Sequence, residues 1–296
     1  MQLFHDNLLN KAFQKQGFVK IPLLNSSQVE KLLHFYFTQI ESNQQQQNNR
    51  GFLTTSNTFN KELVQKVDQF NKSILLPELN KYLCNATFTI SNFLVKEPNP
   101  ESVVPPHQDW LLVDESQFTS FNVWICLHPA DSNSGPLRLI PGSHLLNQSH
   151  RLSGQTAYFN DFISELEPYF VEQPTLPGEC LIFHHSIIHA SSENKSGKSR
   201  VACVIGGFSK DAKLYFFQPD PSRTNGLLRF SIQPETFLQM GINYDPPQSC
   251  YPPEQIHGIF EHWTLDHFLR KLHQKFPETP VSFWTKFRNW LAGFSN

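Results

Sequence analysis

The sequence predicts a mainly β fold with a helical flank on its N-terminal side. Up to about residue 85, apolar residues recur at helical spacing, whereas residues 86 to 232 hold short runs rich in Phe, Ile, Val and Thr between Pro, Gly, Asn and Ser clusters. Aromatic residues make up 13% of the 296 residues, including 27 phenylalanines, which is enough to form a large core. We expect one domain over residues 1–296, with a helical flank at about 1–85, a β core at about 86–232 and a C-terminal extension at about 233–296.

The flank begins with a helix that we expect to end at Gly17, because its apolar residues stop there: Leu8, Leu9, Ala12 and Phe13. A short extended segment, 18–21, follows and leads to Pro22. Ser27 and Glu30 have the spacing of a capping box, which predicts a second helix running to about Ile40.

Two more helices are expected in the flank after a polar, low-complexity loop at 42–49. The first is indicated by apolar residues at helical spacing: Leu63, Val67, Phe70 and Ile74. The second, shorter one is expected at 77–83, since proline commonly begins a new helix.

The β core is expected to be antiparallel. Its strands are predicted at 86–96, 118–128, 136–140, 179–184 and 199–208. Two later strands, 214–218 and 228–232, are expected to continue the sheet. A proline-rich stretch then leads to helical patterns from about 264, with an aromatic tail after residue 283 expected to form a packed helix.

Charge and cysteine usage exclude several classes of protein. The net charge is −2, without the basic excess of a typical nucleic-acid binder. No apolar run approaches the length of a membrane span, and the N-terminus lacks the pattern of a signal peptide. The five cysteines are widely spaced and form no zinc-binding pattern, which favours a reducing compartment. We therefore expect a cytoplasmic protein with no nucleic-acid partner and no membrane span.

The most informative segment is Pro105-Pro-His107-Gln-Asp109-Trp110. In an extended strand, residues i and i+2 point to the same face, so His107 and Asp109 can offer an imidazole nitrogen and a carboxylate oxygen to one metal ion. A further histidine would complete the facial triad of two histidines and one carboxylate that suits non-haem Fe(II). The His-x-Asp spacing has low specificity by itself.

A second segment, 177–208, can supply the missing ligand. We expect a hairpin that places His189 and Arg200 on adjacent strands facing a common cavity. Arginine forms bidentate ion pairs with carboxylates, so Arg200 can anchor the remote carboxylate of a dicarboxylic co-substrate that chelates the metal. The residues alone leave His184 and His185 open as alternatives to His189. His128 and His144 lie near turns and are expected to be structural.

These segments together resemble the phytanoyl-CoA dioxygenase family of Fe(II)/2-oxoglutarate oxygenases. The resemblance covers most of residues 10 to 208, and its order and spacing are highly specific. It is carried by four sequence blocks: GFVKIPLLNSSQVEKLL, PHQDW, NVWICLHPADSNSGPLRLIPGSH and HASSENKSGKSR.

The resemblance implies a double-stranded β-helix, or jelly roll, with His107, Asp109 and His189 as iron ligands and Arg200 as the 2-oxoglutarate anchor. It thereby favours His189 over the alternatives His184 and His185 as the third iron ligand. It also places Ser191 and Trp124 in the co-substrate pocket.

The implied activity is hydroxylation of a small organic molecule by O2, with release of succinate and CO2 and stimulation by ascorbate. Asp109 occupies the position that halogenating relatives leave free for halide, which favours hydroxylation, although desaturation and ring closure stay open. The alternatives are a metal-binding cupin-type enzyme that needs no 2-oxoglutarate, and a non-catalytic binding module. An arginine at position 200 argues against the first, and the intact ligand set argues against the second.

No residue pattern names the substrate. Selectivity is expected to lie in the loops 42–60, 145–175 and 210–262, and the sequence leaves the oligomeric state open.

Overall fold

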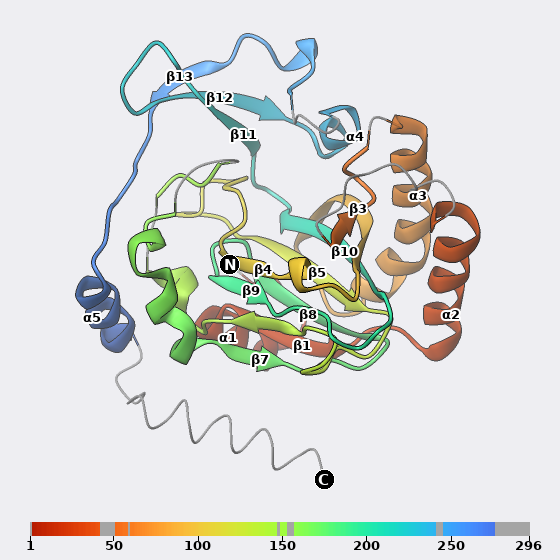
Figure 1. Cartoon of the computed structure of the whole chain (residues 1–296). Coiled ribbons are helices and arrows are strands. Elements are labelled where there is room, and N and C mark those ends of the chain that lie inside the picture. The colour runs from red at the N-terminus through yellow and green to blue at the C-terminus, as the bar shows by residue number, and fades with distance from the viewer. Residues whose placement is uncertain are drawn as a thin grey trace.

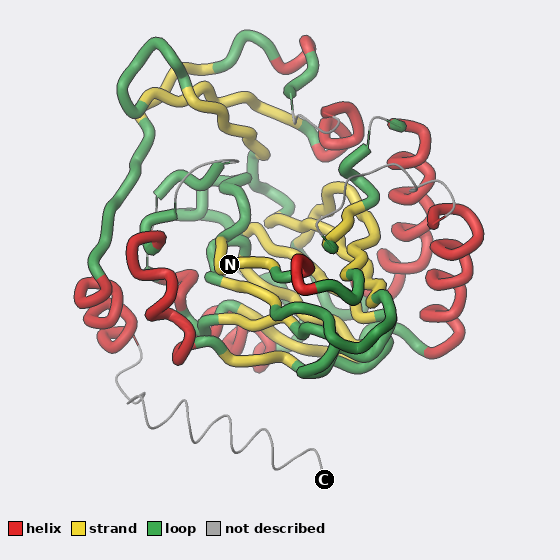
Figure 2. The backbone as a smooth tube through the Cα atoms, viewed as in Figure 1, coloured by secondary structure: helices red, strands yellow, loops and turns green. Residues whose placement is uncertain are grey.

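Two antiparallel sheets packed face to face form the body of the protein (Figures 1 and 2). The computed structural model describes residues 2–41, 51–58, 60–146, 149–152, 157–240 and 245–275. The larger sheet has six strands, in the spatial order β1 (Phe18–Pro22), β8 (Glu179–His184), β5 (Ser120–Cys126), β10 (Arg200–Ser209), β3 (Ala86–Lys96) and β2 (Phe52–Thr54). The smaller has four, β4 (Val104–His107), β9 (His189–Ser191), β6 (Leu137–Leu139) and β7 (Val171–Gln173).

Apolar side chains from both sheets meet between them. Trp124 and Phe183 of the larger sheet pack with Leu137 and Leu139 of the smaller one. This arrangement is a jelly roll, so the predicted fold class, mainly β with a helical flank, is confirmed.

Helices cover the outer face of the larger sheet (Figure 1). They are α1 (Asn7–Gln16), α2 (Ser26–Phe35), which continues as a π-helical turn (Tyr36–Ile40), and α3 (Lys61–Leu79). Their apolar faces bury a core against β5, β8 and β10 that includes Leu32, Val67, Leu75, Val123, Ile182 and Val201. Because β10 is buried on both faces, it reads as an almost continuous apolar run.

The ends of the flanking helices agree only partly with the prediction. Gly17 ends α1 in a left-handed conformation (φ 85°), as expected. The capping box at the start of α2, however, consists of Asn25 and Gln28, two residues before the predicted pair. The two helices expected around 63–83 are a single one, because Pro77 lies within the last turn of α3, where it removes only one helical hydrogen bond.

The strands after residue 210 form a separate sheet, contrary to the prediction that they continue the main one. Its strands are β11 (Leu214–Pro219), β12 (Gly226–Ile232) and β13 (Glu254–His257). Its apolar side chains, including Phe216 and Phe230, pack on Leu112 and Val113, so a small second core holds this sheet beyond the end of the sandwich (Figure 1).

Two short helices complete the chain, α4 (Phe237–Met240) and α5 (Leu265–Lys275). The predicted polar loop at 42–49 and the aromatic tail after residue 283 lie outside the described residues. Among the helices that are described, none combines the length and the apolar character needed to cross a membrane.

Candidate active site

His107 and His189 face each other across two neighbouring strands of the smaller sheet. They are direct register partners of β4 and β9, and their ring centroids lie 4.1 Å apart. The Asp109 carboxylate comes within 3.7 Å of His189 Nε2. One ligand atom from each of the three residues lies within 4.8 Å of the other two.

The backbone fixes which imidazole nitrogen is available in each histidine. Nδ1 of His107 lies 2.8 Å from the carbonyl oxygen of Pro105, and Nδ1 of His189 lies 3.0 Å from that of Ile187. A carbonyl oxygen only accepts hydrogen bonds, so Nδ1 carries the proton in both rings. Both Nε2 atoms are therefore left with a lone pair for a metal ion.

Asp109 is not oriented by strand alternation, as the sequence predicted, but by contacts outside the strand. The strand β4 ends at His107, so the alternation of side chains along a strand does not orient Asp109. Its backbone N–H donates to the carbonyl of His185 (2.8 Å), and its backbone carbonyl accepts from Arg151 Nε (2.8 Å). Its carboxylate accepts a hydrogen bond from Asn122 Nδ2 at 2.8 Å.

The surroundings keep Asp109 and His189 in their metal-binding protonation states. Burial on its own would raise the pKa of the Asp109 carboxyl, but His189, His185 and His107, with the Asn122 hydrogen bond, outweigh it, and the pKa lies below its usual value. Burial, followed by the neighbouring His107, lowers the pKa of His189 to about 4. At neutral pH the site thus presents an ionised carboxylate and a neutral imidazole at position 189.

Two imidazoles and one carboxylate in this arrangement form the donor set of a non-haem iron site. Over the described ranges, His107, Asp109 and His189 make up the one cluster of at least three such ligands with metal-binding spacing. The residues present therefore fit an iron ion.

Arg200 is buried, with 3% of its surface exposed, and faces the same cavity as the triad. Its guanidinium lies over the Trp124 ring, 5.2 Å from the centroid, and Nη1 donates to the carbonyl of Gly135. Nε is buried and has no hydrogen-bond partner in the described part of the chain. The guanidinium therefore retains hydrogen-bonding capacity that a carboxylate can use.

The predicted hairpin between His189 and Arg200 is wrong. β9 belongs to the smaller sheet and β10 to the larger one, so the two residues approach the cavity from opposite sheets. The turn at 194–197 suggested direct pairing of the flanking strands, but it carries the chain from one sheet to the other instead.

All six predicted site residues line one cavity of about 270 Å³, which we call the triad cavity: His107, Asp109, Trp124, His189, Ser191 and Arg200. The other polar side chains in its wall include Thr54, Asn92 and Asn122. The volume is near the lower end of the range for small-molecule sites.

Lys96 is a buried cation that the sequence argument missed. It is the register partner of Arg200, and its ammonium donates to Ser191 Oγ (2.7 Å) and to the carbonyl of Ser192 (2.5 Å). Burial, and then the charges of Arg200 and Arg138, lower its pKa to about 7. Lysines at the ends of strands are usually exposed to solvent, and nothing in the sequence distinguishes the buried Lys96 from such a residue.

Asn122 was also missed, although a signal was present. It is a polar residue inside the apolar run of β5, two positions before Trp124 and therefore on the same face. A half-buried amide at a cavity-facing position is typical of a residue that orients a ligand.

The other histidines occupy different places. His184 Nδ1 lies 2.7 Å from Ser186 Oγ, and the carbonyl of His185 holds the Asp109 backbone, so neither belongs to the metal-spaced cluster. His128 Nδ1 accepts from the backbone of Val201, and His144 Nε2 lies 3.2 Å from the carbonyl of Gln14.

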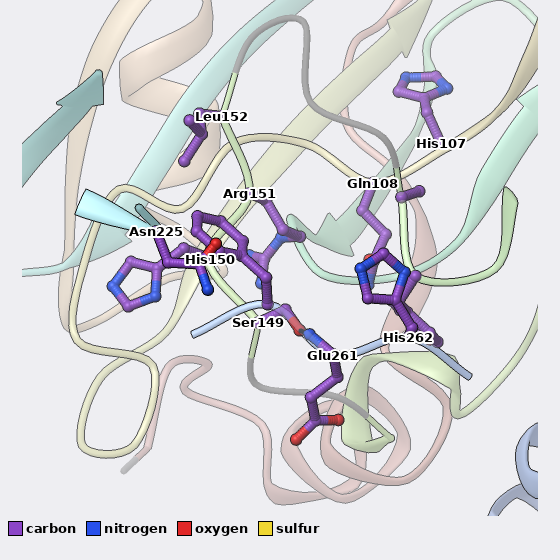
Figure 3. Close-up of a pocket in the computed structure, with 12 residues that line it drawn as sticks. His107, Gln108, Ser149, His150, Arg151, Leu152, Asn225, Glu261 and His262 are labelled. Carbon is purple, nitrogen blue, oxygen red and sulfur yellow. Dashed lines mark hydrogen bonds between the residues drawn. The ribbon is translucent and has the colours of Figure 1, made fainter. Parts of the chain in front are cut away.

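A second cavity, of about 300 Å³, shares the lining residue His107 with the triad cavity. We call it the loop cavity, because segments outside the sheets contribute most of its wall: Gln108, 149–152, 157–158, Asn225 and 260–262. Figure 3 shows these side chains, with His107 at the edge of the group. Two of the three loops predicted to select the substrate, 145–175 and 210–262, meet in this wall.

A family model described as phytanoyl-CoA dioxygenase matches residues 13–202. The chain belongs to the phytanoyl-CoA dioxygenase family. The match contains the whole triad, Arg200, Ser191 and Trp124, which agrees with the resemblance in the sequence.

Relatives in this family share about 31% of their residues with the chain. The phytanoyl-CoA dioxygenase domain-containing protein 1 of Danio rerio is 31% identical over 126 residues, which are 40% of this chain and 43% of the relative. A phytanoyl-CoA dioxygenase of Arabidopsis thaliana is 31% identical over 115 residues, 38% and 41% of the two chains. The chain thus spans about two-fifths of the length of these curated relatives.

Solved structures share the fold. The non-haem α-ketoglutarate-dependent carbocyclase SnoK of nogalamycin biosynthesis aligns with a TM-score of 0.51 at 21% identity, over 71% of this chain and 86% of SnoK. The epimerase SnoN, solved with Fe3+, α-ketoglutarate and nogalamycin RO, aligns with a TM-score of 0.51 at 15% identity, over 88% and 96% of the two chains. At these identities the similarity establishes the common jelly roll.

Proposed function

We propose that this protein is a non-haem Fe(II)- and 2-oxoglutarate-dependent dioxygenase that hydroxylates a small organic molecule and releases succinate and CO2. The observation that carries the proposal is the triad cavity, in which three metal ligands and a buried arginine with an unpartnered Nε approach from opposite sheets. A cupin-type enzyme that needs no 2-oxoglutarate would have no use for a guanidinium in that position.

The triad residues would hold the iron ion. His107 and His189 would coordinate through Nε2, because their Nδ1 protons bond to backbone carbonyls, and Asp109 would coordinate while Asn122 orients its carboxylate. When bound, the iron would supply O2 activation, coupled to oxidative decarboxylation of 2-oxoglutarate and oxidation of a substrate C–H bond.

The opposite end of the triad cavity would hold the co-substrate. Arg200 would bind the remote carboxylate of 2-oxoglutarate, and Ser191, which accepts a hydrogen bond from Lys96, would donate its own hydroxyl proton to the same carboxylate. The Trp124 ring beneath the guanidinium would keep Arg200 in place through a cation–π contact.

The test is turnover of 2-oxoglutarate by the purified protein. With Fe(II), 2-oxoglutarate and ascorbate, the protein should release succinate slowly even without a substrate. Asp109→Ala should abolish this release, while the exposed-site control Asp266→Ala should leave it intact. If the iron-loaded wild-type protein shows no 2-oxoglutarate binding by calorimetry, the proposal fails.

A further inference from the structure

The metal ligand Asp109 lies in a segment outside the sheets. β4 ends at His107 and β5 begins at Ser120, so Asp109 belongs to the connection between two strands. Individual hydrogen bonds hold its peptide groups: its N–H donates to the carbonyl of His185 (2.8 Å), and its carbonyl accepts from Arg151 Nε (2.8 Å). Because the carbonyl carbon is bonded to Cα, a shift of this peptide group would move the carboxylate as well.

Arg151 contacts the segment of Asp109 twice. Besides the hydrogen bond from Nε, its backbone carbonyl accepts from the N–H of Leu111 at 2.9 Å. Its side chain also lines the loop cavity, where Figure 3 shows it among the other wall residues. One side chain of the loop-cavity wall is therefore bonded to the backbone of a metal ligand in the triad cavity.

A mostly buried carboxylate holds the guanidinium of Arg151 in turn. Arg151 Nη2 lies 2.6 Å from Glu115 Oε1, and the two side chains are 9% and 14% exposed. Burial on its own would raise the pKa of Glu115, but Arg151, and then His184, outweigh it, and the pKa lies below its usual value. At neutral pH an ionised carboxylate therefore faces the guanidinium and fixes its orientation.

The two contacts of the guanidinium use different nitrogen atoms. Nη2 forms the ion pair with Glu115, and Nε forms the hydrogen bond to Asp109. A lysine has one nitrogen, at the end of its side chain, so at position 151 it can keep the ion pair but cannot make both contacts. The position thus makes use of a property that only arginine has.

We infer that Arg151 is a positioning residue of the metal site, whose Nε fixes the peptide carbonyl of Asp109 and thereby the direction from which the carboxylate approaches the metal ion. This inference rests on the proposed function. The contact from Arg151 adds to the hydrogen bond that Asn122 donates to the carboxylate itself. Loss of a group that orients a metal ligand typically lowers metal affinity about 10- to 100-fold.

The variant that tests the inference is Arg151→Lys, which keeps a positive charge opposite Glu115 and removes Nε. Circular dichroism first establishes that the variant is folded. Titration of the metal-free protein with Co(II), a spectroscopic probe of the iron site, should then give a Kd about tenfold above that of the wild type. The visible absorption of the bound Co(II) should change too, because it depends on the coordination geometry. A Kd equal to that of the wild type overturns the inference.

Arg138→Lys is the matched control. Arg138 also pairs with a glutamate, Glu167, through Nη1, but its Nε has no hydrogen-bond partner in the described part of the chain. This substitution should leave the Kd of Co(II) unchanged. Equal losses in both lysine variants would mean that the metal site responds to any exchanged arginine, and they would overturn the inference.

Two further variants complete the experiment. If Arg151→Lys does not fold, the double variant Arg151→Met/Glu115→Gln removes both charges together, so that neither is left unpaired, and it should show the same loss of Co(II) affinity. An unchanged affinity in the double variant overturns the inference. Asp109→Ala separates this inference from the proposed function: if Asp109→Ala binds Co(II) as tightly as the wild type, the triad is not a metal site and the proposed function fails.

Discussion

The two cavities that meet at His107 are built in different ways. Strands β3, β4, β5, β9 and β10 contribute most of the polar wall of the triad cavity, so the ladder of backbone hydrogen bonds sets the direction of most of these side chains, with Asp109 as an exception. In the loop cavity, individual hydrogen bonds join segments that are distant in sequence, such as His150 N–H to the Ile259 carbonyl (2.8 Å) and Glu261 N–H to Ser149 Oγ (3.0 Å). The wall of the triad cavity is thus formed mainly by the sandwich, and the wall of the loop cavity mainly by segments outside the sheets.

The largest effect is expected from removing a triad ligand. His189→Ala should lower succinate release by at least about 1,000-fold. The variant lacks a metal ligand, and a bound metal ion lowers the activation free energy by several kcal/mol. The measurement is iron content together with turnover. His34→Ala, at an exposed position of α2, is the control and should match the wild type. Full iron loading and turnover in His189→Ala would show that the triad cavity is not the metal site.

A substitution of Arg200 tests whether this residue binds 2-oxoglutarate. Arg200→Met should raise the Kd of 2-oxoglutarate roughly 10- to 100-fold, since a charged hydrogen bond contributes about 1.5–3 kcal/mol. Iron binding should persist, because the triad is untouched. Calorimetry on the iron-loaded protein measures both, with the exposed Arg270→Met on α5 as control. An unchanged Kd would exclude Arg200 as the anchor.

Asn122 tests whether the larger sheet orients the metal ligand. Asn122→Ala removes the hydrogen bond to the Asp109 carboxylate and should weaken iron affinity about tenfold. Asn92→Ala is a close control, since Asn92 lines the same cavity but bonds to Thr54. Equal losses in both variants would mean that the cavity responds to any lost amide rather than to this contact.

A change in stability, rather than in binding or turnover, is expected from Lys96 in the metal-free protein. The pKa of Lys96 is about 7 in the folded protein and near 10.5 when exposed. Between these values the unfolded chain binds a proton that the folded chain does not, so the free energy of unfolding rises with pH by up to about 1.4 kcal/mol per unit. This contribution is complete above pH 10.5 and is lost as the pH falls to 7. Lys96→Met should remove that slope in denaturant titrations from pH 7 to 10, whereas the surface variant Lys31→Met should keep it. The same slope in both would mean that Lys96 stays charged.

Much of the triad cavity could be predicted from the sequence. The His-x-Asp pair, the late histidine and the strand-opening arginine have recognisable chemistry. Short apolar runs predicted five strands to within two residues at each end, β3, β5, β6, β8 and β10, but not the short strands β2 and β7. Lys96 could not be predicted, because its burial depends on which strands become its neighbours. The pattern of residues within a strand does not specify its neighbours either. The sequence therefore predicted β11 and β12 as strands but not the separate sheet that they form. The loop cavity joins residues more than 100 positions apart, and no local pattern brings Tyr158 and Glu261 together.

The shared residue His107 links the two cavities. Because His107 lines both cavities, a substitution at this position changes both walls at once. Positions 260–262 line the loop cavity alone, so a substitution there changes that wall without a change near the triad, whereas Arg151 in the same wall also holds the backbone of Asp109.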